Sequence, residues 1–189
     1  MIPRNITDYV KVYKNFLSKV FCKNLIKELE NYNWQKHQFH TYKDDVVKHS
    51  NELSVSWDSS KLKEELNNKI WYVIEQYILK DFANFNDWFC SWNGYSEIRF
   101  NRYDEKTEMR EHCDHIFSMF DGVRKGIPTL SIVGSLNNNY KGGEFIMWQT
   151  EHIQIPEGAI LIFPSNFMYP HKVKPIKKGQ RYSFVSWVY

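Results

Sequence analysis

From Trp88 to its C-terminus, the chain consists of short segments in which apolar and polar residues alternate, with turn residues between them. The clearest segment is 129–136, where Leu130, Ile132 and Leu136 alternate with polar or smaller residues. Side chains of a strand point to opposite faces in turn, so this period of two predicts a β-strand. Many short strands of this kind predict an antiparallel sandwich or barrel.

Further strands are predicted wherever the alternation recurs between turns. They are 97–102, 144–148, 153–155, 159–163, 171–173 and 181–189. Glycine and proline residues at 142–143, 156–158 and 164–166 supply the breaks between them. The last two strands are predicted to form one hairpin, with its turn at Lys177, Lys178 and Gly179.

The first third of the chain predicts two amphipathic helices. Ser18 can cap the first, whose apolar stripe fades at 31–33, and the second is expected from Ser59 or Ser60 to about Lys80. The stripes consist of Phe21, Cys22, Leu25, Ile26 and Leu29 in the first helix and Leu62, Leu66, Ile70, Ile74, Tyr77 and Ile78 in the second. Residues 34–57 are polar and predict an irregular segment or a short hairpin. The fold class is therefore mainly β with N-terminal helices (α+β), the two helices packing on one sheet.

Composition limits the possible classes of protein. The 189 residues show no repeat or linker, so we expect one domain, with helical support over about 1–87 and a β core over about 88–189. The net charge is +3, and Lys and Arg are spread along the chain, which does not indicate nucleic-acid binding. Three cysteines without a CxxC motif favour a reducing compartment. No apolar run approaches the roughly 20 residues of a membrane span, so a cytoplasmic location is expected.

Four residues are candidates to bind a metal and its co-substrate. His112 and Asp114 are two apart, so on a strand or at its end both side chains would point to one face. His171 would add a second imidazole, and two histidines with one carboxylate suit iron(II) while leaving coordination positions open. Arg181 could pair with a carboxylate of a small co-substrate, and Ser183, two positions on, could add a hydrogen bond. Taken singly, each histidine or arginine is equally consistent with a structural role.

An ordered series of motifs is similar to the prolyl 4-hydroxylase-like branch of the iron(II)/2-oxoglutarate dioxygenases. The series covers about residues 95–189. It comprises Arg102-Tyr103, His112-x-Asp114, Leu136-Asn137, Gly142-Gly143-Glu144-Phe145, Gly158 to Ser165, Pro170-His171-x-Val173-x-Pro175, Gly179-x-Arg181-Tyr182-Ser183 and Trp187. The start of the first helix, Phe16-Leu17-Ser18 with Cys22-x-x-Leu25-Ile26, is also similar to the family's N-terminal helix.

The resemblance implies a role for each matching residue. His112, Asp114 and His171 would bind Fe(II), and Arg181 would bind the distal carboxylate of 2-oxoglutarate, with Tyr103 as a donor and Ser183 as a weaker one. O2 would be the second co-substrate, and ascorbate a possible reductant. The implied fold is a double-stranded β-helix, a cupin-like jelly roll.

Two departures from the family pattern bear on substrate and co-substrate. Ser135 stands where many relatives have a tyrosine, and Arg181 stands where collagen-type members often have lysine. The implied activity is hydroxylation of a C–H bond in peptidyl proline or another protein side chain, with release of succinate and CO2. Two alternatives stay open, an oxygenase of a small molecule such as an amino acid or nucleotide, and an inactive jelly-roll binding module.

Some neighbouring features have plainer interpretations. Trp148 and Trp187 are interpreted chiefly as packing aromatics, and His115 as pointing away from the ligands. Two polar stretches flank the predicted iron site, Asp104 to Glu111 and Ile116 to Pro128. Both are candidate lids over the substrate.

Overall fold

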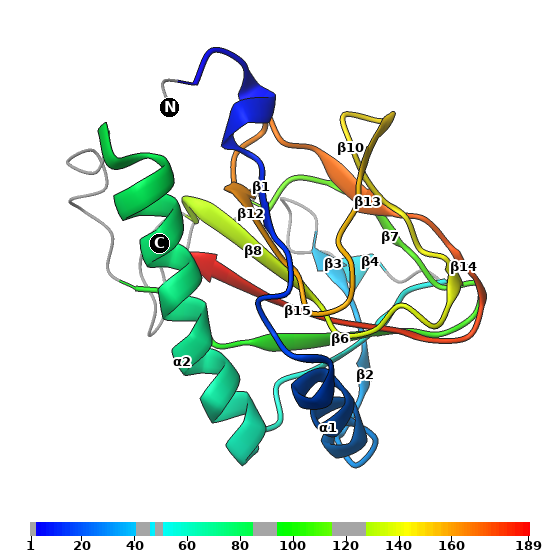
Figure 1. The fold of residues 1–189 in the computed structure, drawn as a ribbon. Helices are drawn as coiled ribbons and strands as arrows, with labels where there is room; N and C mark the ends of the chain where they lie inside the picture. The colour runs from blue at the N-terminus through cyan, green and yellow to red at the C-terminus, as the bar shows by residue number, and fades with distance from the viewer. Residues whose placement is uncertain (1–2, 41–45, 48–50, 85–93, 115–127) are drawn as a thin grey trace.

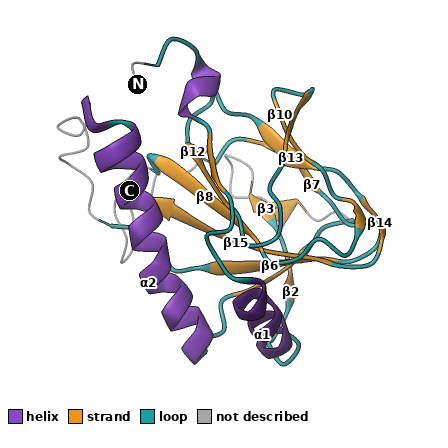
Figure 2. Cartoon of the chain, viewed as in Figure 1, coloured by secondary structure: helices purple, strands orange, loops and turns teal. Residues whose placement is uncertain are grey.

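The computed structural model describes residues 3–40, 46–47, 51–84, 94–114 and 128–189. In this part of the chain the strands form two main antiparallel sheets (Figures 1 and 2). The larger sheet has seven strands, in the order β1 (Lys11–Tyr13), β12 (Ile160–Pro164), β8 (Leu130–Ser135), β15 (Arg181–Val188), β6 (Arg99–Tyr103), β5 (Ser54–Ser56) and β2 (Gln35–Lys36). The smaller sheet has four, in the order β11 (Glu151–Ile153), β10 (Phe145–Met147), β13 (His171–Val173) and β7 (Met109–His112).

Two further strand pairs lie outside these sheets. β14 (Ile176–Lys178) pairs with β9 (Lys141–Gly142), and β3 (Phe39–His40) pairs with β4 (Val46–Val47). A short 3-10 helix, η1 (Ile6–Tyr9), precedes β1. The mainly β character predicted from the alternating segments is confirmed.

The two predicted helices are present. Helix α1 (Lys19–Leu29) begins after Ser18, whose hydroxyl accepts a hydrogen bond from the Phe21 amide at 3.1 Å. Helix α2 (Lys61–Glu75) is capped by Ser60 in the same way and continues as a π-helical segment, η2 (Gln76–Asp81). No helix in the described ranges is long and apolar enough to cross a membrane.

The larger sheet separates two apolar clusters. On one face Phe100, Ile132 and Phe184 pack with the apolar stripes of α1 and α2. On the other face Val133 and Phe163 pack with side chains of the smaller sheet. Figure 1 shows α2 on one side of the larger sheet and β10, β13 and β7 on the other. The helices therefore cover one face of this sheet, as predicted, and the second face is free to build a site against the smaller sheet.

The prediction of a single hairpin carrying His171 and Arg181 is wrong. β13, which begins at His171, pairs with β10 and β7 in the smaller sheet. β15, which begins at Arg181, pairs with β6 and β8 in the larger sheet. The connecting strand β14 pairs with β9, and Gly142 lies so close to the backbone of Pro175 that a side chain there would clash. The chain thus crosses from one sheet to the other between the two residues.

The hairpin alternative predicted for 34–57 is observed, since β2 and β5 pair with each other and extend the larger sheet beyond β6. The strand β1 was not predicted. β1 forms the opposite edge through its pairing with β12. The strand predicted over 153–155 is observed slightly earlier, as β11. Each of these strands has at most three residues, too few for alternation to be recognised.

Gly134 provides a test of the packing between the sheet and the helices. It lies opposite Phe184 in the pairing of β8 with β15, and a Cβ atom at position 134 would overlap the Phe184 ring. Phe184 is fully buried and cannot swing aside. We expect Gly134→Ala to lower the free energy of unfolding by about 1–3 kcal/mol, measured by urea denaturation.

The matched control is the double variant Gly134→Ala with Phe184→Leu, which removes the ring that clashes. If the cost arises from this overlap, the double variant is less destabilised than the sum of the two single variants. Additive effects would contradict the explanation.

Candidate functional site

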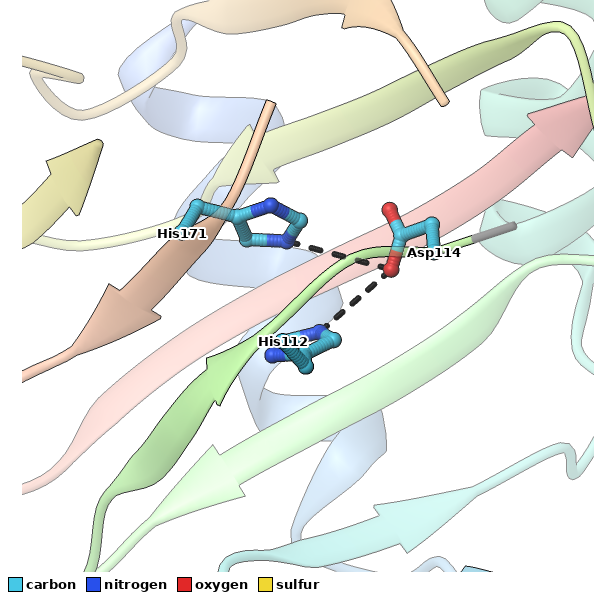
Figure 3. A group of neighbouring side chains, drawn as sticks. All are labelled: His112, Asp114 and His171. Carbon is cyan, nitrogen blue, oxygen red and sulfur yellow. Dashed lines mark ion pairs between the residues drawn. The ribbon is translucent and has the colours of Figure 1, made fainter. Parts of the chain in front are cut away.

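Two strands of the smaller sheet bring the metal-binding candidates together. His112 is the last residue of β7, and His171, the first of β13, lies directly opposite it. Their ring centroids are 4.4 Å apart. Asp114 follows β7 by two residues and points toward both imidazoles (Figure 3). The pair of histidines separated by 59 positions in the sequence is therefore a cross-strand pair in the fold.

The potential ligand atoms converge on one point. Asp114 Oδ1 lies 3.3 Å from His112 Nε2 and 3.8 Å from His171 Nε2 (Figure 3). The ligand atoms of the three residues all lie within 4.8 Å of one another. Such a spacing allows all three to reach a single ion.

Both imidazoles are oriented by the backbone two residues before them. His112 Nδ1 lies 2.8 Å from the Arg110 carbonyl oxygen, and His171 Nδ1 lies 3.0 Å from that of Tyr169. A carbonyl oxygen only accepts hydrogen bonds, so in each neutral ring Nδ1 carries the proton and donates it. The lone pair of each Nε2 is then directed at the point where the three residues meet. This tautomer is the one a metal ligand needs.

Asp114 is held as a carboxylate. Burial opposes its ionisation, but the two imidazoles and the hydroxyl of Ser131, which donates to Oδ2 at 2.6 Å, more than offset this and keep its pKa well below the usual range. Ser131 Oγ is also 2.6 Å from Ser165 Oγ. The second oxygen of Asp114 is therefore fixed, and the first faces the histidines.

His171 lies in an apolar environment. The Phe145 ring stacks on its imidazole at 5.3 Å, and the Phe163 ring meets it edge-on at 5.0 Å. Burial lowers the pKa of His171, despite the opposing effect of Asp114. The ring is therefore neutral near pH 7 and available as a donor of its Nε2 lone pair.

Arg181 is almost completely buried on the cavity side of the larger sheet, with 2% of its surface exposed. Its Nη1 group donates to Ser183 Oγ at 3.0 Å, and its guanidinium carbon lies 4.9 Å from the centre of the Tyr103 ring. Burial raises the pKa of Tyr103, although Arg181 acts in the opposite direction, so the phenol stays protonated. Ser183 thus orients the guanidinium, and Tyr103 lies beside it as a possible second donor.

One cavity connects Arg181 to the histidines and Asp114. Arg181 and Tyr103 line it together with all three metal-ligand candidates. Its wall also carries Arg99, Asn101 and Trp187, to which the sequence analysis gave no role in the site. The alternation along 97–102 and 181–189 is the signal that could have found them, since they share a strand face with Tyr103 or Arg181.

Ser135 and Trp148 do not line this cavity, whereas Met109 of the candidate lid at Asp104 to Glu111 does. Ser135 is buried, and its hydroxyl donates to the Asn137 carbonyl at 3.3 Å. Trp148 donates from Nε1 to the Met168 carbonyl at 2.7 Å and does not line the cavity. The candidate lid at Asp104 to Glu111 contains a turn and most of β7. His115 and the second candidate lid, except for Pro128, lie outside the described residues.

The donor set defines what could bind. Two imidazole nitrogens and one carboxylate oxygen are suited to a divalent transition metal such as Fe(II), with coordination positions left for other molecules. A buried guanidinium in the same cavity favours a ligand with a carboxylate. The residues present therefore fit a metal together with an acidic small molecule.

Comparisons with known sequences point to one superfamily. A family model described as the 2OG-Fe(II) oxygenase superfamily matches residues 98–189. A PKHD-type hydroxylase of Idiomarina loihiensis is 30% identical over 97 residues, which cover 49% of this chain and 42% of that protein. A PKHD-type hydroxylase of Xylella fastidiosa is 33% identical over 100 residues, or 48% of this chain and 43% of that protein. The chain thus matches less than half the length of these curated relatives.

Solved structures share the fold over nearly the whole chain. A Trichoplax adhaerens prolyl hydroxylase, in complex with a hypoxia inducible factor peptide fragment, has a TM-score of 0.72 at 16% identity and covers 97% of this chain and 84% of its own. A Pseudomonas putida prolyl-4-hydroxylase has a TM-score of 0.67 at 18% identity, with coverages of 95% and 91%. The 2OG complex of a viral collagen prolyl hydroxylase from Paramecium Bursaria Chlorella virus-1 has a TM-score of 0.63 at 17% identity, with coverages of 95% and 94%. At these identities the likeness concerns the fold alone.

Ser131 gives a test of the site that leaves its ligand candidates in place. Removing its hydroxyl frees Asp114 Oδ2, so the carboxylate loses its fixed orientation. We expect Ser131→Ala to weaken the binding of Mn(II) by about 10-fold to 100-fold, measured by isothermal titration calorimetry. The control is Ser186→Ala, a buried serine whose hydroxyl bonds to Ser96 instead. Equal Mn(II) affinities in the two variants would show that Ser131 does not support a metal site.

Proposed function

We propose that this chain, whose residues 98–189 belong to the 2OG-Fe(II) oxygenase superfamily, is a dioxygenase that hydroxylates a C–H bond. The proposal assigns Fe(II) to His112, Asp114 and His171. It assigns the distal carboxylate of 2-oxoglutarate to Arg181 and Tyr103, with Ser183 orienting the guanidinium. Fe(II), 2-oxoglutarate and O2 follow from the superfamily, and ascorbate as a reductant stays a prediction.

One observation carries the proposal. The ligand atoms of two histidines and one aspartate converge within 4.8 Å, in a cavity whose wall also holds the buried Arg181. A structural ion pair would not need the two Nε2 atoms directed at one point with both Nδ1 atoms engaged by backbone carbonyls. The arrangement is explained if the cavity binds a metal and an acidic co-substrate together.

The chemistry divides between the bound groups and the protein. Fe(II), with 2-oxoglutarate and O2, supplies the oxidising power for the hydroxylation, with succinate and CO2 as products. The chain positions the metal ligands and the co-substrate. Ser131 fixes Asp114, the carbonyls of Arg110 and Tyr169 fix the imidazoles, and Arg181 fixes the far end of the co-substrate. Phe145 and Phe163 pack against His171 and exclude water from that side.

Several independent observations support a more specific fold, enzyme class and substrate class. The two antiparallel sheets that face each other suit a double-stranded β-helix, which we propose as the exact fold, with 1–189 as one domain. The sequence motifs and the solved prolyl hydroxylases support a prolyl 4-hydroxylase-like enzyme. One of those structures holds a peptide, so we propose a peptide or protein side chain as the substrate. The alternative, a small-molecule substrate, is retained because the cavity itself does not require a peptide.

The decisive test is anaerobic addition of Fe(II) and 2-oxoglutarate. The proposal predicts a visible metal-to-ligand charge-transfer band that is lost in His171→Ala and in Asp114→Ala, because each variant removes one ligand. Ser186→Ala should keep the band, since it removes a buried hydroxyl bonded to Ser96. Absence of a band in the native protein, or a band that survives both ligand variants, would leave the chain as a jelly-roll binding module without this activity.

A second prediction concerns Arg181. The buried guanidinium has a hydroxyl and a phenol beside it but no carboxylate partner in the described part of the chain. We expect Arg181→Gln to weaken 2-oxoglutarate binding by about 10-fold to 100-fold, as one charge-assisted pairing is lost. Arg181→Lys keeps the charge but not the two-pronged geometry, so its affinity for 2-oxoglutarate should lie between those of the native protein and Arg181→Gln. Titration of the charge-transfer band measures both, and an unchanged affinity in Arg181→Gln contradicts the assignment.

The nature of the substrate requires a separate experiment. Reaction mixtures with peptide libraries and with metabolite pools would be compared by mass for products heavier by one oxygen atom. Products found only among peptides support the proposed substrate class. Products found only among metabolites would establish the alternative.

A further inference from the structure

Arg99 is a second arginine in the cavity. It is the first residue of β6, and its side chain lines the cavity together with Asn101 and Tyr103, which alternate with it along the strand. Its Nε group donates to Asn101 Oδ1 at 3.1 Å, and its guanidinium carbon lies 5.1 Å from the centre of the Trp187 ring. These two contacts fix the plane of the guanidinium but leave its terminal nitrogens available.

The charge of Arg99 has no carboxylate partner in the part of the chain that the structure describes. Burial lowers the pKa of Arg99, and Tyr103 and then Asp114 oppose this from across the cavity, but the Asp114 oxygens are already engaged by Ser131 and the imidazoles. Arg99 is partly exposed in the cavity wall, so a guanidinium without a carboxylate partner among the described residues can pair there with an anion that arrives from outside.

A neighbouring arginine shows that the lack of a carboxylate partner is not a general property of arginines on β6. Arg102 also lies on β6 and also stacks on an indole, at 4.8 Å from the Trp34 ring. It does not line the cavity, and its Nε lies 3.6 Å from Asp104 Oδ1. Arg102 therefore has a local counter-charge, whereas none of the described residues supplies one to Arg99 on the face that carries the site.

Arg99 and Arg181 are anchored at opposite ends of the pairing of β6 with β15. In the pairing of β6 with β15, Tyr103 lies opposite Arg181, whereas Arg99 lies opposite Val185. Four residues along a strand correspond to about 13 Å. Arg99 is instead close to Trp187, which lies opposite Ser131, the residue that holds Asp114. A co-substrate whose distal carboxylate is bound by Arg181 would thus leave Arg99 free.

We propose that Arg99 binds a carboxylate of the molecule that is hydroxylated, and is a specificity-determining residue of the site. This inference rests on the proposed function and adds a substrate class to it. The substrate would carry a carboxylate near the carbon atom that is hydroxylated. The indole of Trp187, on which Arg99 stacks, offers an apolar face for the rest of the molecule. The carboxylate can belong to a free amino acid or to an acidic peptide.

The experiment uses matched probes that differ only in charge. One set pairs the free L-amino acids with their primary amides, and the other pairs N-acetylated, C-terminally amidated peptides containing Asp with those containing Asn. The protein is loaded with Fe(II) and 2-oxoglutarate. Probe binding is followed anaerobically by the change in melting temperature and in the charge-transfer band, and turnover in air by succinate release.

The expected result is a response to at least one carboxylate probe, with affinity for its amide lower by about tenfold or more. Arg99→Gln should abolish this difference, and Arg99→Lys should restore part of it. The affinity for 2-oxoglutarate should be unchanged in Arg99→Gln, because Arg181 is anchored at the other end of the pairing of β6 with β15. Arg102→Gln, the matched control on the far face of the same strand, should behave like the native protein.

Several results would overturn the proposal. Equal responses to acids and amides, no response to any carboxylate probe, or an unaltered response in Arg99→Gln would each exclude it. A tenfold loss of 2-oxoglutarate affinity in Arg99→Gln would instead make Arg99 a co-substrate ligand. If the native protein gives no charge-transfer band, the proposed function fails separately, and the melting-temperature comparison still tests whether Arg99 binds carboxylates.

Discussion

The pairing of β15 with β6 on one side and β8 on the other is the constraint on which the rest of the structure depends. Alternation along β15 sends Phe184 into the cluster beneath the helices and Arg181 into the cavity. A shift of one residue in register would exchange the two sets and bury a charge among the helices. The hydrogen bonds that order the core therefore also order the site, and neither can vary independently of the other.

The candidate ligands are held in place by contacts with the protein itself. The carbonyls that orient His112 and His171 belong to residues two positions earlier, so the backbone conformation itself sets the ring positions. Ser131 reaches Asp114 from the larger sheet, whereas both histidines come from the smaller one. The site thus depends on the two sheets facing each other. Its side chains lose little freedom when a metal binds, which favours affinity and defined geometry.

The sequence predicted the elements whose signals are long or local. The caps at Ser18 and Ser60 and the alternation in 129–136 are of this kind. The cluster of His112, Asp114 and His171 was also predicted, from the types of these residues and from the family resemblance, although pairing across 59 positions has no local signature. The hairpin prediction failed for a related reason. Proximity in sequence favoured pairing of β13 with β15, whereas tertiary pairing placed them in different sheets. Arg99 was missed because an arginine in an alternating strand normally faces solvent.

The two arginines of the cavity differ in exposure and in the contacts that hold their guanidinium groups. Arg181 is almost completely buried and its guanidinium is fixed by Ser183, as suits a ligand that is the same in every turnover. Arg99 is partly exposed and rests on the face of Trp187, where its terminal nitrogens can adapt. With only one arginine, the cavity would offer similar attraction to any small dianion. Because the two arginines are anchored at opposite ends of the pairing of β6 with β15, the proposed selection depends on where a second carboxylate lies relative to the reacting carbon, and not on total charge.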